Sequence, residues 1–288
     1  MSVVSARRCL AFYGHSYTGY GPSMTFQEVL RAFGSEGIDT TAFMPRLRRR
    51  PDNDVRQVEG LPLLLRHLPW RYVSRLGVEL TERKFREAVR AAGSTHFVFA
   101  FPNLSVDAVK EISDLGVTLI REMIGLHTGT ARRIMLEEHA REGLPEFDAI
   151  TEADVAAEIE WLRHADAIFA PNAEVTRSLL EFGISEERIM ETSYGWSPTR
   201  FPLAGKPRNF EQELVLLFVG RVSYAKGAHV LLRAWHQAGC PGRLMLAGQL
   251  EPELERRMAT ELAHKSIERL GFVTDLSSTY ASANAFAL

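Results

Sequence analysis

The residues whose types and spacing could do chemistry lie closest together in the stretch 214–227, which reads LVLLFVGRVSYAKG. Its first six residues are apolar, and such a run followed by turn residues predicts a strand buried on both faces of a parallel sheet. Gly220 permits a tight turn, Arg221 and Lys226 follow it, and a segment with helical spacing begins at Gly227. Open α/β sheets bind ligands at the carboxyl ends of strands and helix N-termini attract anions, so the stretch predicts a phosphate or diphosphate site. The alternative is that both cations are ordinary solvated loop charges.

The order Gly-Arg-x-x-x-x-Lys-Gly at 220–227 resembles the donor-site motif of glycosyltransferase family 4, whose members have the GT-B fold. The resemblance implies that Arg221 and Lys226 contact the diphosphate of a nucleotide-sugar donor and act in catalysis, within a loop bounded by Gly220 and Gly227. The likeness continues downstream through Val230, Leu231, Leu232, Ala234 and Trp235, the strand pattern at 243–247 with Gly248, the run Gly271-Phe272-Val273, and Tyr280.

A second glycine-bearing loop, 14–22, follows a first predicted strand at 8–13. A predicted helix from about Pro22 to Phe33 and a strand at 38–43 come next, which is the opening of a doubly wound domain. The loop lacks the Gly-x-Gly-x-x-Gly fingerprint, so a nicotinamide-dependent dehydrogenase is disfavoured. In family 4 a loop in this place faces the cleft between domains, which makes Gly19 and Gly21 candidates. The alternative is an ordinary turn between strand and helix.

His127 lies in a loop that follows a predicted strand at 117–121. A histidine beyond the carboxyl end of such a strand is placed for proton transfer near neutral pH. In many family 4 enzymes a histidine from this part of the N-terminal domain sits beside the reacting sugar, so the resemblance makes His127 a catalytic candidate; a structural histidine is the equal alternative. No His-x-x-x-His spacing occurs among the nine histidines, and neither a metal nor another cofactor is expected.

Local signals mark several helix starts. Ser105 and Asn172 stand where N-caps belong, and Thr151 with Asp154 resembles a capping box in which Asp replaces the usual Glu.

The pattern as a whole predicts an α/β, GT-B-like protein with two Rossmann-like doubly wound domains. Residues 1–203 form the N-terminal, acceptor-binding domain, 204–213 a linker rich in turn residues, and 214–288 a partial C-terminal donor domain. A doubly wound half usually needs about 100 to 150 residues, so we expect the second domain to be incomplete and the chain to be truncated at its C-terminus. The Pro-Ser element and paired-glutamate motif that follow in family 4 are absent, and Ser197 stands in the run Tyr-Gly-Trp-Ser where the family has Asp.

Residues 46–76 are basic and rich in apolar and aromatic side chains, with Pro62 and Pro69 interrupting any helix. Such a segment could lie peripherally on an anionic membrane surface. The alternative is a long surface insertion with solvated arginines. The arginines are Arg46, Arg48, Arg49, Arg50, Arg66, Arg71 and Arg75.

Composition is that of an ordinary globular protein, with 45% apolar and 24% charged residues among 288. A net charge of −2 gives no drive toward nucleic acid, and no run is long enough for a membrane span or a signal peptide. Cys9 and Cys240 are far apart, which fits a reducing cytoplasm. We therefore expect a cytoplasmic protein, associated with the cytoplasmic face of the membrane if residues 46–76 bind lipid.

The resemblance implies a retaining glycosyltransferase that moves a sugar from a UDP- or GDP-sugar to the hydroxyl of a sugar or lipid-linked acceptor, in polysaccharide or cell-envelope biosynthesis. One alternative is a non-catalytic nucleotide-sugar-binding protein, a truncated remnant that is inactive alone. Another is a GT-B sugar-nucleotide epimerase, which would act on the nucleotide sugar without an acceptor.

Overall fold

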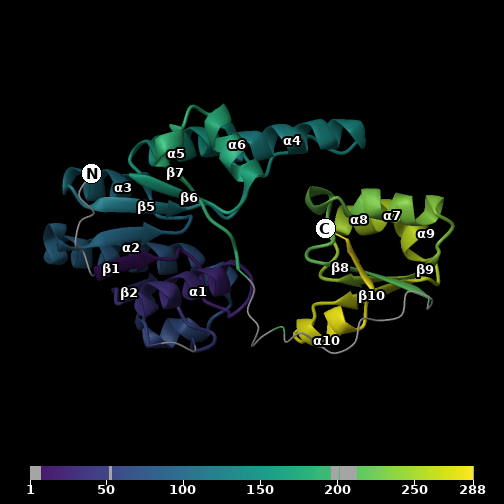
Figure 1. The fold of residues 1–288 in the computed structure, drawn as a ribbon, viewed down its shortest axis with the longest axis horizontal. Coiled ribbons are helices and arrows are strands. Elements are labelled where there is room, and N and C mark those ends of the chain that lie inside the picture. The colour runs from purple at the N-terminus through teal and green to yellow at the C-terminus, as the bar shows by residue number, and fades with distance from the viewer. Residues whose placement is uncertain (1–7, 52–53, 196–200, 202–212, 288) are drawn as a thin grey trace. The chain divides into compact units, whose positions relative to one another are not determined.

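The computed structural model describes residues 8–51, 54–195, 201 and 213–287. The chain divides into two compact units, Met1–Tyr194 and Gly195–Leu288, called unit 1 and unit 2 below (Figure 1). Most of the predicted linker, 204–212, lies outside the described residues, as does Ser197.

The described strands of unit 1 form one parallel sheet of seven strands in the order β3-β2-β1-β4-β5-β6-β7. From β1 the chain first builds outward through β2 and β3, and then returns to build the other side from β4. The sheet therefore has its topological switch point between β1 and β4. The strands are β1 (Arg8–Phe12), β2 (Asp39–Met44), β3 (Arg56–Glu59), β4 (Phe97–Ala100), β5 (Thr118–Glu122), β6 (Ala167–Ala170) and β7 (Ile189–Glu191).

Helices cover both faces of this sheet and enclose two apolar cores. Adjacent residues of β1 point into different cores, since Ala11 packs with Phe26 of α1 whereas Phe12 packs with Phe85 of α2. Helices α3, α5 and α6 contribute to the same core as α2. The helices are α1 (Pro22–Ser35), α2 (Trp70–Ala92), α3 (Val106–Asp114), α4 (Thr128–Arg141), α5 (Glu152–Arg163) and α6 (Ala173–Glu181).

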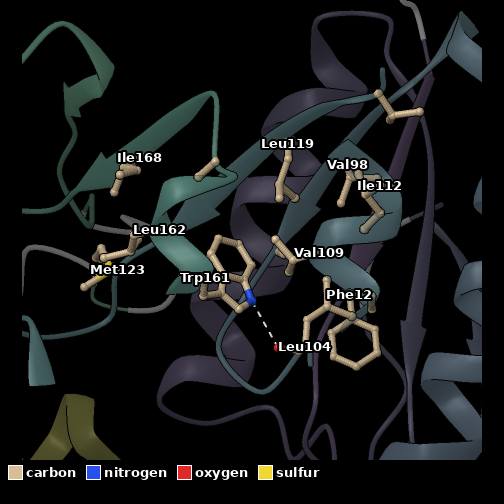
Figure 2. Close-up of a cluster of buried hydrophobic side chains, with 14 of the residues drawn as sticks. Phe12, Val98, Leu104, Val109, Ile112, Leu119, Met123, Trp161, Leu162 and Ile168 are labelled. Atoms are coloured by element: carbon tan, nitrogen blue, oxygen red, sulfur yellow. Dashed lines mark hydrogen bonds between the residues drawn. The ribbon is translucent and has the colours of Figure 1, made fainter. Parts of the chain in front are cut away.

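The larger core is drawn in Figure 2, where Trp161 of α5 lies beside Val109 of α3 and Leu162. The indole N–H of Trp161 donates to the carbonyl oxygen of Leu104 at 3.0 Å. Because that N–H has a partner, the ring is buried without leaving a polar atom unsatisfied. The same hydrogen bond fixes the loop that joins β4 to α3.

The predicted helix starts are confirmed. The side chains of Ser105 and Asn172 each accept a hydrogen bond from the backbone N–H three residues further on, at 3.1 and 3.0 Å. Thr151 and Asp154 form the reciprocal capping box. These features depend only on neighbouring residues, which is why the sequence alone reveals them.

Helix α2 begins at Trp70, within the segment where Pro62 and Pro69 were expected to interrupt any helix. Pro69 immediately precedes the helix, so its ring removes no helical hydrogen bond. The buried face of α2 repeats every four residues, through Val73, Gly77, Thr81, Phe85 and Val89. The first half of α2 is therefore part of the fold of unit 1 and not an insertion looped out from it.

Arg46 is likewise not a solvated arginine. It is 2% exposed, and its guanidinium donates to Ser16 Oγ and to the carbonyl oxygens of Arg66 and Leu68 at 2.8, 2.9 and 2.6 Å. A buried guanidinium with three acceptors fixes the loop after β1 against the segment that leads into α2. Arg48, Arg49 and Arg50 remain exposed, as expected.

Unit 2 contains a four-stranded parallel sheet in the order β10-β9-β8-β11. The segment 252–262 is divided into two short helices at the buried residue Met258, whose backbone leaves the helical region. The last described strand, β11, pairs with β8. The elements are β8 (Leu214–Val219), α7 (Ala228–Gln237), β9 (Gly242–Ala247), α8 (Pro252–Arg257), α9 (Ala259–Leu262), β10 (Ile267–Gly271), α10 (Leu276–Ala281) and β11 (Ala285–Ala287).

Among the described residues of both units, no helix combines the length and the apolar character needed to cross a bilayer.

Candidate functional site

The loop that follows β8 has a backbone that requires glycine. Gly220 has φ +140°, a region that L-residues rarely adopt. It meets Gly248, which follows β9, so closely that a Cβ on Gly248 would lie 1.7 Å from the carbonyl oxygen of Gly220. Two glycines thus allow the carboxyl ends of neighbouring strands to approach each other at the place where the sequence predicted a ligand site.

Gly227 ends this loop and begins α7. It adopts the left-handed conformation, with φ 66° and ψ 17°, after the short 3-10 turn Tyr224–Lys226. No side chain caps the N-terminus of α7 among the described residues. Backbone N–H groups and the positive end of the helix dipole are therefore available to an anion.

Arg221 and Lys226 project from the same loop, and both are exposed. Neither forms an ion pair within the part of the chain that the structure describes, in contrast to most arginines of the protein. The loop itself is fixed, because the Tyr224 N–H donates to Glu251 Oε2 at 2.9 Å and Val222 exchanges backbone hydrogen bonds with the segment after β9. Two cations without an acidic partner among the described residues, on a fixed loop that leads into a helix N-terminus, can hold a diphosphate.

In unit 1, Gly19 and Gly21 shape the turn before α1. Both have positive φ, +79° and +53°, and Gly21 takes the N-cap position of α1, again without a side-chain cap. Ser23 Oγ holds the turn by accepting from the Gly19 N–H at 3.2 Å and donating to the carbonyl of Tyr20 at 2.9 Å. The two glycines are therefore required by the conformation of the turn. A ligand role for them stays a prediction.

His127 is placed at the N-cap of α4, five residues after the end of β5, and is fully buried. Its Nδ1 accepts from the Gly129 N–H at 3.1 Å, and its ring stacks on Phe182 with centroids 3.9 Å apart. Burial lowers the pKa of His127, an effect that Glu158 and Glu181 oppose. These contacts are those of a helix cap, and the proposed catalytic role of His127 stays a prediction.

Beside His127 lies a buried polar network that joins β5, α4 and α5. Glu158 accepts from the backbone N–H and the hydroxyl of Thr128 at 2.6 and 2.5 Å, and lies 3.6 Å from Arg121. The guanidinium of Arg121 stacks over the ring of Trp161 at 4.4 Å. A buried charge pair with this many partners positions the elements that it joins.

Glu122, the last residue of β5, is a titratable group that sequence reasoning missed. It is 2% exposed, and burial raises its pKa to about 8, although a hydrogen bond with Tyr194 and the charge of Arg121 act in the opposite direction. A carboxyl group with a perturbed pKa at the carboxyl end of a parallel strand is a recognised type of functional candidate. Its position was visible in the sequence, but its burial and its hydrogen bond with the distant residue Tyr194 were not.

The predicted site residues thus fall into separate groups. Gly220, Arg221, Lys226 and Gly227 share one loop of unit 2. Gly19 and Gly21 follow β1 of unit 1, and His127 follows β5 of the same unit.

Comparison with known families gives a match to the part of the chain that contains the loop 220–227. Residues 213–288 match the family described as "Glycosyl transferases group 1". The match covers well under half of the chain. No curated protein matches the sequence significantly.

Solved structures share the fold of nearly the whole chain. WaaG, a glycosyltransferase involved in lipopolysaccharide biosynthesis, matches with a TM-score of 0.63 and 13% identity, over 97% of this chain and 74% of its own. HepE (Alr3699) of Anabaena, in complex with UDP and glucose, matches with a TM-score of 0.59 and 12% identity, over 96% of this chain and 73% of its own. A glycosyltransferase from Rickettsia africae matches with a TM-score of 0.59 and 12% identity, over 97% of this chain and 72% of its own. The predicted α/β, GT-B-like fold is confirmed.

Proposed function

We propose that this protein is a glycosyltransferase that moves a sugar from a nucleotide diphosphate donor to an acceptor hydroxyl. The observation that carries the proposal is the loop 220–227 at the carboxyl end of β8, where Arg221 and Lys226 form no ion pair with a described residue. Both precede the N-terminus of α7, which no described side chain caps. The family match over residues 213–288 and the UDP and glucose found in HepE, which shares the fold, support a nucleotide-sugar donor.

The chemical task of the loop is to stabilise the negative charge that develops on the departing diphosphate. The Arg221 guanidinium can hold two phosphate oxygens at once, and the Lys226 ammonium adds a compact positive charge. The first N–H groups of α7 contribute in the same direction. Loss of either side chain should cost about 2–4 kcal/mol of transition-state stabilisation, as loss of an oxyanion donor does in other enzymes. Retention of anomeric configuration, without a metal or another cofactor, belongs to the same proposal.

For His127 we propose the catalytic role that the resemblance implies, orienting the acceptor or polarising the reacting sugar. Its buried ring, stacked on Phe182, holds the junction of β5 and α4. In this proposal unit 1 holds the acceptor, and the glycine loop at Gly19 and Gly21 lies near it.

The acceptor is proposed to be linked to a lipid, with the protein on the cytoplasmic face of a membrane. The support is a surface of unit 1 that exposes Leu63, Leu64 and Tyr72 by 68%, 86% and 69%. Arg71 and Arg75 of α2 are exposed on the same segment. Apolar side chains next to cations suit the headgroup region of an anionic bilayer.

Thermal melting with added nucleotides tests the donor site. A ligand that binds only the folded state stabilises it by about 2.7 kcal/mol at a hundredfold excess over its dissociation constant. We expect UDP or GDP, but not ADP, to raise the melting temperature of the wild-type protein, and Arg221→Ala to abolish the shift. A matched control is Arg243→Ala, an exposed arginine at the amino end of β9, which should leave the shift intact.

A cooperative melt that no nucleotide moves would contradict the donor site. If a nucleotide binds, the products then distinguish the reactions. A transferase shows only slow donor hydrolysis until an acceptor is added, a sugar-nucleotide epimerase converts the donor alone, and a binding protein converts nothing.

A further inference from the structure

Unit 1 brings a polar pair together at the switch point of its sheet. His15 follows β1 and Asn103 follows β4, the two strands between which the strand order reverses. Asn103 Nδ2 lies 2.5 Å from His15 Nε2. An amide nitrogen only donates, so His15 Nε2 accepts, and the proton of the neutral imidazole sits on Nδ1.

The backbone that carries Asn103 has an uncommon conformation. Asn103 has φ 78°, a conformation that few non-glycine residues adopt. Gly14 makes the approach possible, because a Cβ there would lie 2.6 Å from Asn103 Cβ. The loop that carries Asn103 is also fixed, since the Leu104 carbonyl accepts from Trp161 and the Ser105 hydroxyl donates to Glu82. Surrounding contacts thus impose the conformation of Asn103, as they do where strain serves function.

Both side chains remain exposed, and each has a second polar atom for which the described residues supply no hydrogen-bond partner. His15 Nδ1–H can donate, and Asn103 Oδ1 can accept. The neighbouring loops displace enough water to lower the pKa of His15, which keeps the ring neutral at neutral pH. The pair therefore offers one donor and one acceptor side by side, which is the complement of hydroxyl groups and not of a phosphate.

An aromatic ring completes the group. Trp70, the first residue of α2, is half-buried, and its ring centroid lies 6.5 Å from that of His15. The buried Arg46 holds this arrangement, since its guanidinium lies 5.2 Å from the centre of the Trp70 ring and donates to Ser16 beside His15. A flat apolar surface beside hydrogen-bonding side chains suits a sugar ring, which presents C–H groups on its faces and hydroxyls at its edge.

We propose that His15, Asn103 and Trp70 form a sugar-binding subsite of unit 1, in which the His15–Asn103 pair recognises hydroxyls of a pyranose ring. This inference rests on the proposed function and extends it, because it names the residues that select the sugar. The ring could belong to the acceptor or to the donor, and the experiment separates the two sources.

The test uses saturation-transfer NMR of the full chain with glucose, galactose and N-acetylglucosamine, with and without UDP, and calorimetric titration with UDP and UDP-glucose. Asn103→Gly is the key variant, since glycine adopts a positive φ without strain and the variant should fold at least as well as the wild type. We expect Asn103→Gly and His15→Gln to weaken sugar binding about tenfold, in line with the loss of one or two hydrogen bonds. The control is His164→Ala. His164 precedes β6, at the amino ends of the parallel strands, and its substitution should leave sugar binding unchanged.

If the variants weaken binding of free sugars and leave UDP-glucose unaffected, the subsite belongs to the acceptor. If they weaken UDP-glucose binding relative to UDP, it belongs to the donor sugar. Unchanged affinity for free sugars and UDP-glucose in both variants would overturn the inference, as would a wild-type protein that binds neither. UDP binding that depends on Arg221 is measured in the same samples, so failure of the subsite and failure of the proposed function can be told apart.

Discussion

At the scale of single residues, Glu122 links burial to the pH dependence of stability. Its pKa is raised from an ordinary value of 4.5 to about 8, chiefly by burial. Below pH 4.5 the carboxyl group is protonated in both the folded and unfolded states. Between these two values the unfolded chain releases the proton while the folded chain retains it, so Glu122 makes the free energy of unfolding fall as the pH rises. Above the folded pKa the free energy of unfolding falls no further on account of Glu122.

Glu122→Gln should therefore remove a pH-dependent loss of stability. Glutamine keeps the shape of a protonated glutamate and has no charge to desolvate. We expect the variant to match the wild type near pH 4 and to exceed its free energy of unfolding by a few kcal/mol near pH 8.5. Urea denaturation across this range measures the difference.

Glu187→Gln is the control, because it changes an exposed carboxyl group. Its free energy of unfolding should equal that of the wild type at every pH. If the free energies of unfolding of Glu122→Gln and the wild type changed with pH in the same way, Glu122 would be ionised in the folded protein at neutral pH. In that case it would not have the perturbed carboxyl group that makes it a functional candidate.

At the scale of secondary-structure elements, the start of α4 depends on a contact with the end of α6. A Cβ on Gly129 would lie 2.0 Å from Cζ of Phe182, whose ring stacks on His127. The Phe182 ring therefore occupies the space that any side chain at Gly129 would need. The same contact fixes His127, so the geometry of the β5–α4 junction depends on a glycine.

Gly129→Ala should destabilise unit 1 through overpacking. The Phe182 ring must move and give up its contact with His127, and such changes typically cost about 1–3 kcal/mol. Chemical denaturation followed by tryptophan fluorescence measures the loss. Gly125→Ala is the matched control, because a Cβ there would meet nothing within 4 Å. Equal stability of the two variants would show that the stack of His127 on Phe182 contributes nothing to the fold.

At the scale of the whole molecule, the features that the sequence predicts are those that depend on neighbouring residues. The loop 220–227 is an example, since its strand, glycines and cations follow one another along the chain. The caps at Ser105 and Asn172 are similar. Parallel strands with glycine loops between helices also specify an α/β fold with little ambiguity.

The features that the sequence does not reveal depend on contacts between distant residues. His15 and Asn103 are separated by 88 positions, and only the strand order brings their loops together. Glu122 has a hydrogen-bond partner in Tyr194, and Arg46 has acceptors in carbonyl groups of the segment before α2. A local reading treats such polar residues as solvated, because it contains no information about what covers them.

The surface around Leu63, Leu64 and Tyr72 combines two forces that a membrane test can separate. The exposed apolar side chains would enter the headgroup region, and Arg71 and Arg75 would attract anionic lipid. Each arginine near a charged surface contributes about 1 kcal/mol, which salt screens. The two contributions should therefore differ in their response to ionic strength.

We expect the protein to float with vesicles that contain phosphatidylglycerol and to stay unbound with vesicles of phosphatidylcholine alone. Removing both cations, in Arg71→Ala/Arg75→Ala, should lower binding tenfold or more, at about 1 kcal/mol per arginine, and abolish its dependence on salt. Leu63→Ser/Leu64→Ser should lower binding at every salt concentration, whereas Leu180→Ser, an exposed leucine of α6, should not. Binding that is equal for both lipids and unaffected by either double substitution would place the membrane contact elsewhere, because this surface would then supply neither of the forces assigned to it.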